Sequence, residues 1–216
     1  MEYREVIFKD GCIFKGMIKT SFLPPLGSNI KKKHITGTGE FTFADENTIY
    51  KGALSKGQPH GFGEKFWSDS DGKVYKGYWT KGSMNGRGEL TLCEGEVYLG
   101  EFKNGFPNGK GIRKWKNGDL YEGEYINGFQ QGQGLFVSTV QGWKYQGDWI
   151  KGKMTGKGLC QWADGTVYEG LWLDCSKEGQ GSLRYADGSH FSGDFKEDLP
   201  HGYGKKVLSD GSWYLG

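Results

Sequence analysis

The chain has 216 residues, of which 39 are glycine and 15% are aromatic, and its formal net charge at pH 7 is +2. This aromatic content is too high for a flexible Gly/Ser linker or a disordered segment. Five prolines without a Gly-X-Y triplet exclude collagen. A net charge near zero gives no reason to expect nucleic acid or another highly charged partner for the chain as a whole.

Residues 1–36 are predicted as a divergent first repeat, which contains Phe14, followed by an irregular basic insert, Lys19 to Ile35. The region holds seven Lys/Arg and three Asp/Glu, a charge of +4; the totals of 28 and 26 leave 21 and 23, or −2, for residues 37–216. Lys31, Lys32 and Lys33 are therefore a candidate contact for anionic lipid. Because a typical polybasic lipid site has about four to eight basic residues, a solvated loop is the competing interpretation.

Residues 37–216 are predicted as an array of about eight repeats, the last one cut short. Gly-x-Gly pairs and tight-turn dipeptides such as Asp-Gly recur with nearly the same period as an aromatic-x-Gly motif. From residue 50 onward this motif recurs every 23 to 25 residues, at Tyr50, Tyr75, Tyr98, Tyr121, Tyr145, Tyr168, Phe191 and Tyr214. A fixed period of this length is typical of repeat architectures, so we expect effectively one continuous repeat domain.

Each repeat is predicted to be two β-strands. In "GLCQWADGTVYEGLW", residues 158–172, two alternating segments flank Asp164 and Gly165. An Asp-Gly pair between such segments predicts a hairpin closed by a type I′ turn. Helices would lose about 1 kcal/mol for each interior glycine. The predicted fold is therefore all-β: an elongated, single-layer antiparallel meander of stacked β-hairpins.

One face of this sheet is predicted to alternate large rings with glycine. Residues two apart in a strand share a face, which groups Tyr75 with Gly77 and Trp79. The same count places Gly156 and Gly158 of a Gly-x-Gly pair on the ring face. A ring lying over a neighbouring glycine compensates for the weakness of glycine in strands. We expect this packing to be the core, with solvated side chains on the other face.

The segments "YKGYWTKGSMNGRGEL", "YLGEFKNGFPNGKGI", "YEGEYINGFQQGQGL" and "YQGDWIKGKMTGKGL" resemble MORN (membrane occupation and recognition nexus) repeats. The resemblance implies a twisted sheet with an open groove. It also implies roles as assembly scaffolds in cytoskeletal, ciliary or membrane-associated structures, or as accessory domains of lipid kinases and lysine methyltransferases. Two repeats depart from the pattern, with Cys175 and Asp198 in place of the glycine seven residues after the aromatic residue, and others have Glu46-Asn47 and Gln141-Gly142 in place of Asp-Gly. Their loops are predicted to differ in shape.

No pattern in the sequence predicts catalysis, a cofactor or a metal site. The segment "GKMTGKGL", residues 152–159, lacks the spacing, hydroxyl residue and helix of a phosphate-binding loop. His60 and His201 occupy the repeat position that Asn85 occupies elsewhere, which is typical of a polar loop residue. The four cysteines form no Cys-x-x-Cys pair, as expected of reduced thiols inside the cell. No signal peptide is recognisable, and no apolar run approaches the roughly 18 residues of a membrane span.

We therefore expect a non-enzymatic cytoplasmic scaffold, associated with the cytoskeleton or a cilium, that binds protein partners as a peptide or helix in the groove. Large rings dominate interface energetics, although pure packing is the competing interpretation for each ring. The candidate partner groove consists of Tyr98, Phe102, Trp115, Tyr121, Tyr125, Tyr145 and Trp149. The alternatives are a module that contacts anionic phospholipid through Lys31 to Lys33, and an N-terminal targeting domain of a larger enzyme.

The sequence ends at "DGSWYLG", three residues into a predicted strand. An exposed edge strand is a template for pairing with another chain, so a homodimer or end-to-end association is a further expectation. A longer polypeptide with an enzyme domain beyond residue 216 is the alternative.

Overall fold

The computed structural model describes residues 1–24, 28–45, 48–67 and 72–216. These residues form eighteen β-strands, three short 3-10 helices and no α-helix. None of the described helices is long and apolar enough to span a bilayer. The all-β, antiparallel prediction is confirmed.

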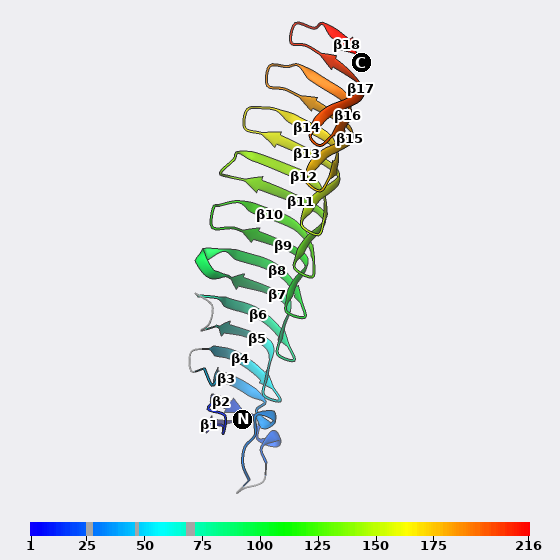
Figure 1. The fold of residues 1–216 in the computed structure, drawn as a ribbon. Helices are drawn as coiled ribbons and strands as arrows, with labels where there is room; N and C mark the ends of the chain where they lie inside the picture. Colours follow the sequence, from blue (N-terminus) through cyan, green and yellow to red (C-terminus); the bar gives the residue numbers. More distant parts are fainter. Residues whose placement is uncertain (25–27, 46–47, 68–71) are drawn as a thin grey trace. The chain divides into compact units, whose positions relative to one another are not determined.

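The chain divides into two compact units, Met1–Asn108 and Gly109–Gly216. Strands of the first unit are Glu2–Ile7 (β1), Ile13–Ile18 (β2), Gly37–Thr42 (β3), Ile49–Ser55 (β4), Gln58–Phe66 (β5), Val74–Thr80 (β6), Ser83–Thr91 (β7) and Val97–Lys103 (β8). The boundary falls inside Phe106–Lys114 (β9). Strands of the second unit are Leu120–Ile126 (β10), Phe129–Ser138 (β11), Trp143–Ile150 (β12), Lys153–Trp162 (β13), Val167–Leu173 (β14), Ser176–Arg184 (β15), His190–Lys196 (β16), Leu199–Val207 (β17) and Trp213–Leu215 (β18). Within each unit the strands follow one another in chain order as antiparallel neighbours (Figure 1).

The strands are joined by two kinds of turn, type I′ turns and bulged loops. The type I′ turns do not lie at the Asp-Gly pairs, where they were predicted, but at the opposite ends of the strands. Lys81 and Gly82, between β6 and β7, have φ angles of 48° and 81°, the positive pair of a two-residue type I′ turn. At Asp164 and Gly165 only the glycine has a positive φ, 90°. The Gly165 amide donates to the Trp162 carbonyl at 3.0 Å, and the Trp162 amide donates to the Thr166 carbonyl at 2.9 Å. This is a three-residue loop with a glycine bulge, so the type I′ prediction was wrong there.

The repeats that lack the turn glycine keep the same turn. Cys175 and Asp198 have φ angles of 73° and 70°, and Asp174 and Glu197 before them have φ angles of 50° and 48°. The predicted difference in loop shape is therefore wrong at these two turns, because the flanking strands impose the left-handed conformation on residues that rarely adopt it. Glu46 and Asn47 lie outside the described residues.

From Gly61 onward, the first glycine of each Gly-x-Gly pair has a positive φ, and Gly156 is an example of the β-bulge that results. Gly156 has a φ of 100°, and the pairing register between β12 and β13 shifts between Gly147 and Trp149. A β-carbon on Gly156 would lie 2.9 Å from the Asp148 β-carbon, on the face opposite the rings. The prediction that Gly156 shares the ring face was wrong, whereas Gly158 does lie under the Tyr145 ring. A positive φ at a bulge turns the strand and moves this position to the other face.

We call the two sides the aromatic face and the polar face. In the first unit, the polar face carries one row of directly opposed residues with alternating charge. Lys15 pairs with Glu5, and Lys51 pairs with Glu40, both at 3.1 Å. The row crosses β1 to β7 as Glu5, Lys15, Glu40, Lys51, Glu64, Lys76 and Glu89. Opposite charges across strands favour this register.

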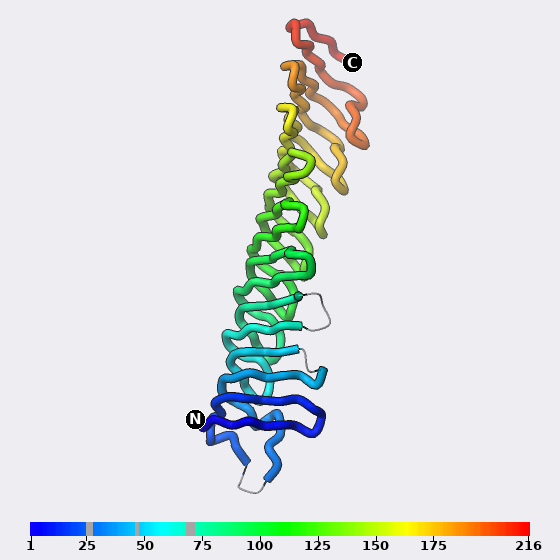
Figure 2. The backbone as a smooth tube through the Cα atoms, turned by 90° about the vertical axis from the view of Figure 1, so that its left-hand side faces the viewer, coloured from blue at the N-terminus to red at the C-terminus, as the bar shows by residue number. Residues whose placement is uncertain are grey.

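The insert between β2 and β3 packs back onto the first unit. Figure 2 shows this connection leaving the strands and returning beside them. It includes the 3-10 helices Thr20–Phe22 (η1) and Lys32–His34 (η2); the third, Cys93–Gly95 (η3), precedes β8. The Gly57 amide donates to the Ile35 carbonyl at 2.7 Å, and the Ile35 side chain is fully buried. The end of the insert is thus held on the turn between β4 and β5.

Candidate binding surface

The aromatic face is built from rings that lie over glycine. A β-carbon on Gly77 would lie 2.5 Å from the Tyr75 hydroxyl, and one on Gly88 would lie 2.5 Å from the ring edge of Tyr75. The Tyr75 hydroxyl donates to the Tyr78 carbonyl at 3.0 Å. Glycine is required at both positions because the ring occupies the space of the missing side chains. This packing confirms the predicted arrangement of rings and glycine.

Successive repeats are joined by edge-to-face ring contacts. The Tyr75 ring centroid lies 5.0 Å from that of Trp79 in its own repeat and 4.9 Å from that of Phe102 in the next. In the second unit, the Tyr145 ring contacts Trp149 at 5.4 Å and Trp172 at 5.3 Å in the same way. These separations and angles are those at which aromatic pairs stabilise proteins beyond their buried area.

Burial alters the acidity of these side chains. It raises the pKa of Tyr50 and Tyr75 to about 12. Burial likewise raises the pKa of the Cys160 thiol to about 12. A thiol protonated at neutral pH is a poor nucleophile, so Cys160 has the character of a packing residue.

Most residues of the predicted partner groove are inside this packing. Trp115 is half-buried and accessible from the aromatic face. The other six are buried: Tyr98, Phe102, Tyr121, Tyr125, Tyr145 and Trp149. The sequence therefore assigned these rings to the right face, but a partner laid on that face would meet them only at their edges.

Three half-buried rings of the second unit gather at the end of the strands that leads into the bulged turns. Phe136 and Trp143, both half-buried, have ring centroids 5.0 Å apart, and Phe136 lies 5.7 Å from Trp115. The Arg113 guanidinium lies over the Trp115 ring at 5.1 Å. We call Trp115, Phe136 and Trp143 the accessible ring cluster. Of these three rings, the sequence analysis selected only Trp115. Phe136 and Trp143 could have been identified by their positions near the loop that joins their two strands.

The three lysines of the candidate lipid contact lie in different environments. Lys31 and Lys33 are exposed, whereas the Lys32 amine donates to the Asp10 carboxylate at 2.5 Å and to the Cys12 sulfur at 3.0 Å. Burial acts to lower the pKa of Lys32, but these two hydrogen bonds outweigh it and the pKa is raised. Two of the three lysines are therefore exposed to solvent, and the amine of the third is bound to groups of the first unit.

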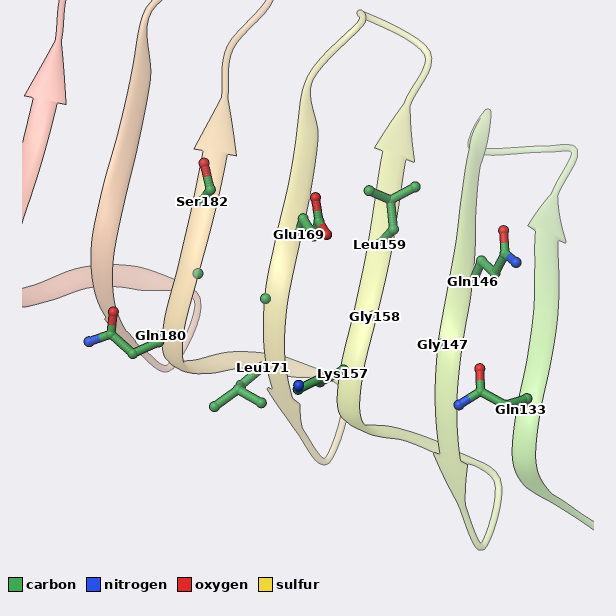
Figure 3. Close-up of a pocket in the computed structure, with 12 residues that line it drawn as sticks. Gln133, Gln146, Gly147, Lys157, Gly158, Leu159, Glu169, Leu171, Gln180 and Ser182 are labelled. Atoms are coloured by element: carbon green, nitrogen blue, oxygen red, sulfur yellow. The ribbon is translucent and has the colours of Figure 1, made fainter.

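The polar face of the second unit has a trough of about 790 Å³ across β11 to β15 (Figure 3). Its floor is a row of directly opposed glycines, including Gly158 and Gly170. Side chains that flank the floor are Gln133, Gln146, Lys157, Leu159, Glu169, Leu171, Gln180 and Ser182. The Gln180 amide is already hydrogen bonded to the Asp194 carboxylate. The trough offers amide and hydroxyl groups on an open surface, which agrees with the solvated face predicted for this side.

A family model for the MORN repeat matches seven segments that together make up more than half of the chain. The segments are residues 50–72, 75–97, 98–120, 121–140, 145–167, 168–190 and 191–213. The chain belongs to the MORN-repeat family. No curated protein sequence matches this MORN-repeat protein.

Two solved structures align with most of this chain at low similarity. One is the TCP domain of SAS-4 (dCPAP) of Drosophila melanogaster in complex with a proline-rich motif of Ana2 (dSTIL), at 14% identity over 90% of this chain and 97% of that chain, with a TM-score of 0.43. The other is the TCP10 domain of Danio rerio CPAP in complex with a peptide of STIL, at 13% identity over 99% and 97% of the two chains, with a TM-score of 0.36. The function proposed below rests on the residues of this MORN-repeat protein itself.

Proposed function

We propose that this MORN-repeat protein is a non-enzymatic scaffold that binds a segment of a partner protein on the aromatic face of its second unit. The observation that carries the proposal is the accessible ring cluster, in which Phe136 contacts both Trp115 and Trp143 and all three rings remain half-buried. Their buried neighbours, such as Tyr145, are already enclosed by the repeat packing. Large rings with remaining accessible surface are the residues that most often dominate protein interfaces.

The cluster has polar groups at its margin that fit a peptide. The Trp143 indole nitrogen donates to the Gln141 side-chain carbonyl at 2.7 Å, which fixes the orientation of this ring. The Arg113 guanidinium is held over Trp115, beside the rings. An apolar side chain of a partner would contact the rings, while the partner backbone or an acidic side chain would meet polar groups at the edge.

The setting we propose for this scaffold is a cytoskeletal, ciliary or membrane-associated assembly in the cytoplasm. The basis is the family, whose members occur in such structures. Contact with anionic lipid through Lys31 and Lys33, and association of two copies, stay predictions: sedimentation with anionic vesicles checks the first and light scattering checks the second.

The test is selection of binding peptides from a displayed library, followed by measurement of Kd for matched variants. Trp115→Ala with Trp143→Ala should weaken binding at least tenfold, or about 1.4 kcal/mol. The control is Phe62→Ala with Tyr78→Ala. These two exposed rings, whose centroids lie 5.6 Å apart, are on the polar face of the first unit, so their removal should leave Kd unchanged. Thermal unfolding checks that both variants fold. If no peptide is selected, or if the two variants bind equally well, the proposal is wrong.

A further inference from the structure

Two repeats of the first unit have a buried aliphatic residue where the later repeats have a ring: Ile18 in the divergent repeat at Phe14, and Leu54 in the repeat at Tyr50. Four residues after the aromatic residue that opens each repeat, the repeat that begins at Tyr50 has Leu54. The later repeats have a ring at this position: Trp79, Phe102, Tyr125, Trp149, Trp172 and Phe195. Leu54 is buried on the aromatic face, as those rings are. The row of rings at this position therefore begins at Trp79, in the repeat after Leu54.

The Tyr50 ring therefore has less aromatic contact than the Tyr75 ring. The Tyr75 ring has edge-to-face partners in its own repeat and in the next repeat, at 5.0 and 4.9 Å. The Tyr50 ring contacts Trp79 of the next repeat at 5.5 Å, while its own repeat supplies the aliphatic Leu54. An incoming ring at this place would give Tyr50 the arrangement that the later repeats have.

A pocket of about 240 Å³ lies at this position. Its apolar walls are Phe41, Phe43, Tyr50, Leu54, Pro59 and Trp79. Pockets for drug-sized ligands usually enclose about 300 to 1,000 Å³, so this one has the size for a single large side chain rather than for a cofactor. It lies on the aromatic face of the first unit.

Two lysines line the same pocket. The Lys65 amine lies over the Phe43 ring at 4.6 Å, and the Lys32 amine lies over the Phe41 ring at 5.6 Å. Lys32 reaches this place because the insert is held on the turn at Gly57. Both amines are thus already positioned as cations beside aromatic walls, where the face of a further ring would be attracted to them.

We infer that this pocket binds an aromatic side chain of a partner protein, which takes the place of the ring missing at residue 54. The inference rests on the proposed function, since it assumes that the aromatic face binds protein segments, but it concerns a separate site in the first unit. The incoming ring lies edge-to-face with Tyr50 and near the amines of Lys32 and Lys65. An aliphatic side chain would fill the space without either of these directional contacts.

The test uses the Trp115→Ala, Trp143→Ala protein, so that binding at the accessible ring cluster does not contribute. Peptides are selected on this protein from a displayed library, and each is compared with a version in which its aromatic residue is leucine. The aromatic peptide should bind about tenfold more tightly than the leucine peptide. Lys65→Met should weaken the aromatic peptide several-fold and leave the leucine peptide nearly unchanged.

Filling the pocket from within gives the decisive variant. Leu54→Phe supplies the missing ring from the chain itself, so it should abolish the preference for the aromatic peptide while thermal unfolding shows an equal or higher midpoint. Leu54→Ala, which enlarges the pocket, should keep the preference.

The inference is overturned if Leu54→Phe binds the aromatic peptide as tightly as the protein with Leu54. It is also overturned if Leu54→Ala loses the preference while still folded, or if no peptide is selected on this protein. Peptides that bind only when Trp115 and Trp143 are present would leave the proposed function standing without this site.

Discussion

The hydroxyl oxygen of Tyr75 lies 2.5 Å from the place that a β-carbon on Gly77 would occupy, so the ring and the missing side chain share one space. Gly77→Ala should therefore destabilise the protein by about 1 to 3 kcal/mol, because the added methyl group forces the ring or the backbone to move. Urea unfolding measures the change. Thr80→Ala, an exposed position on the same strand, is the control and should stay within about 0.5 kcal/mol of the parent. Equal stabilities for the two variants would contradict the role of Tyr75 over Gly77.

The turn between β14 and β15 provides a prediction of the opposite sign. Cys175 is exposed and has a φ of 73°, a left-handed conformation that costs a non-glycine residue about 1 to 2 kcal/mol. Cys175→Gly should stabilise the protein by about 1 kcal/mol, measured by chemical unfolding. Cys93→Gly replaces another exposed free cysteine and tests whether loss of a thiol alone has this effect. A Cys175→Gly protein that is no more stable than the parent would show that the turn holds this conformation without strain.

The buried tyrosines predict a loss of stability in alkali. Tyr50 and Tyr75 have an ordinary pKa of 10.0 that burial raises to about 12 in the folded chain. Below pH 10 both folded and unfolded chains keep the proton, so the stabilisation is fully present. Between pH 10 and about 12 the unfolded chain ionises first, and the free energy of unfolding should fall as pH rises. Tyrosinate absorbance and urea unfolding across this range measure the effect. Complete ionisation of these tyrosines near pH 10 in the folded protein would contradict it.

The alternating charges on the polar face predict a salt-dependent effect. Glu64 lies directly opposite Lys51 and Lys76 on its two neighbouring strands. Glu64→Lys places three like charges side by side and should cost about 1 kcal/mol at low ionic strength, with a smaller cost in 1 M salt.

The matched control for this charge change is in the second unit. Glu122 lies in the equivalent row, but its cross-strand neighbours are Ile112 and Leu135. Glu122→Lys should therefore show little dependence on salt when unfolding is measured in parallel. If both variants respond to salt equally, the charge row of the first unit has no specific role in stability.

The sequence alone predicted the repeat period, the strands and the aromatic face, because Tyr75, Gly77 and Trp79 combine period-two spacing with a ring that needs a neighbouring glycine. It did not predict the turns correctly. Asp164 and Gly165 match a type I′ turn as well as a bulged three-residue loop, and only the pairing register of the flanking strands decides between them. The bulge at Gly156 likewise depends on its partner strand.

The candidate site was predicted at the level of the face rather than of the residue. Tyr121 and Trp143 share the aromatic face, yet the first is enclosed by rings of adjacent repeats and the second lies beside a loop. Spacing along one strand cannot distinguish these cases, because burial depends on the neighbouring strands. The pocket beside Leu54 also depends on Lys32 of the insert, whose return to the sheet no local pattern indicates.

The most direct test of partner binding at the accessible ring cluster is fluorine NMR of protein that contains fluorinated tryptophan, recorded during titration with a selected peptide. The chain has eight tryptophans, and single Trp→Phe variants assign their resonances. The resonances of Trp115 and Trp143 should shift strongly, whereas those of the buried Trp149 and Trp172 should move little. Saturable binding that leaves Trp115 and Trp143 unchanged, or that shifts only Trp213 outside the cluster, would contradict the proposed function.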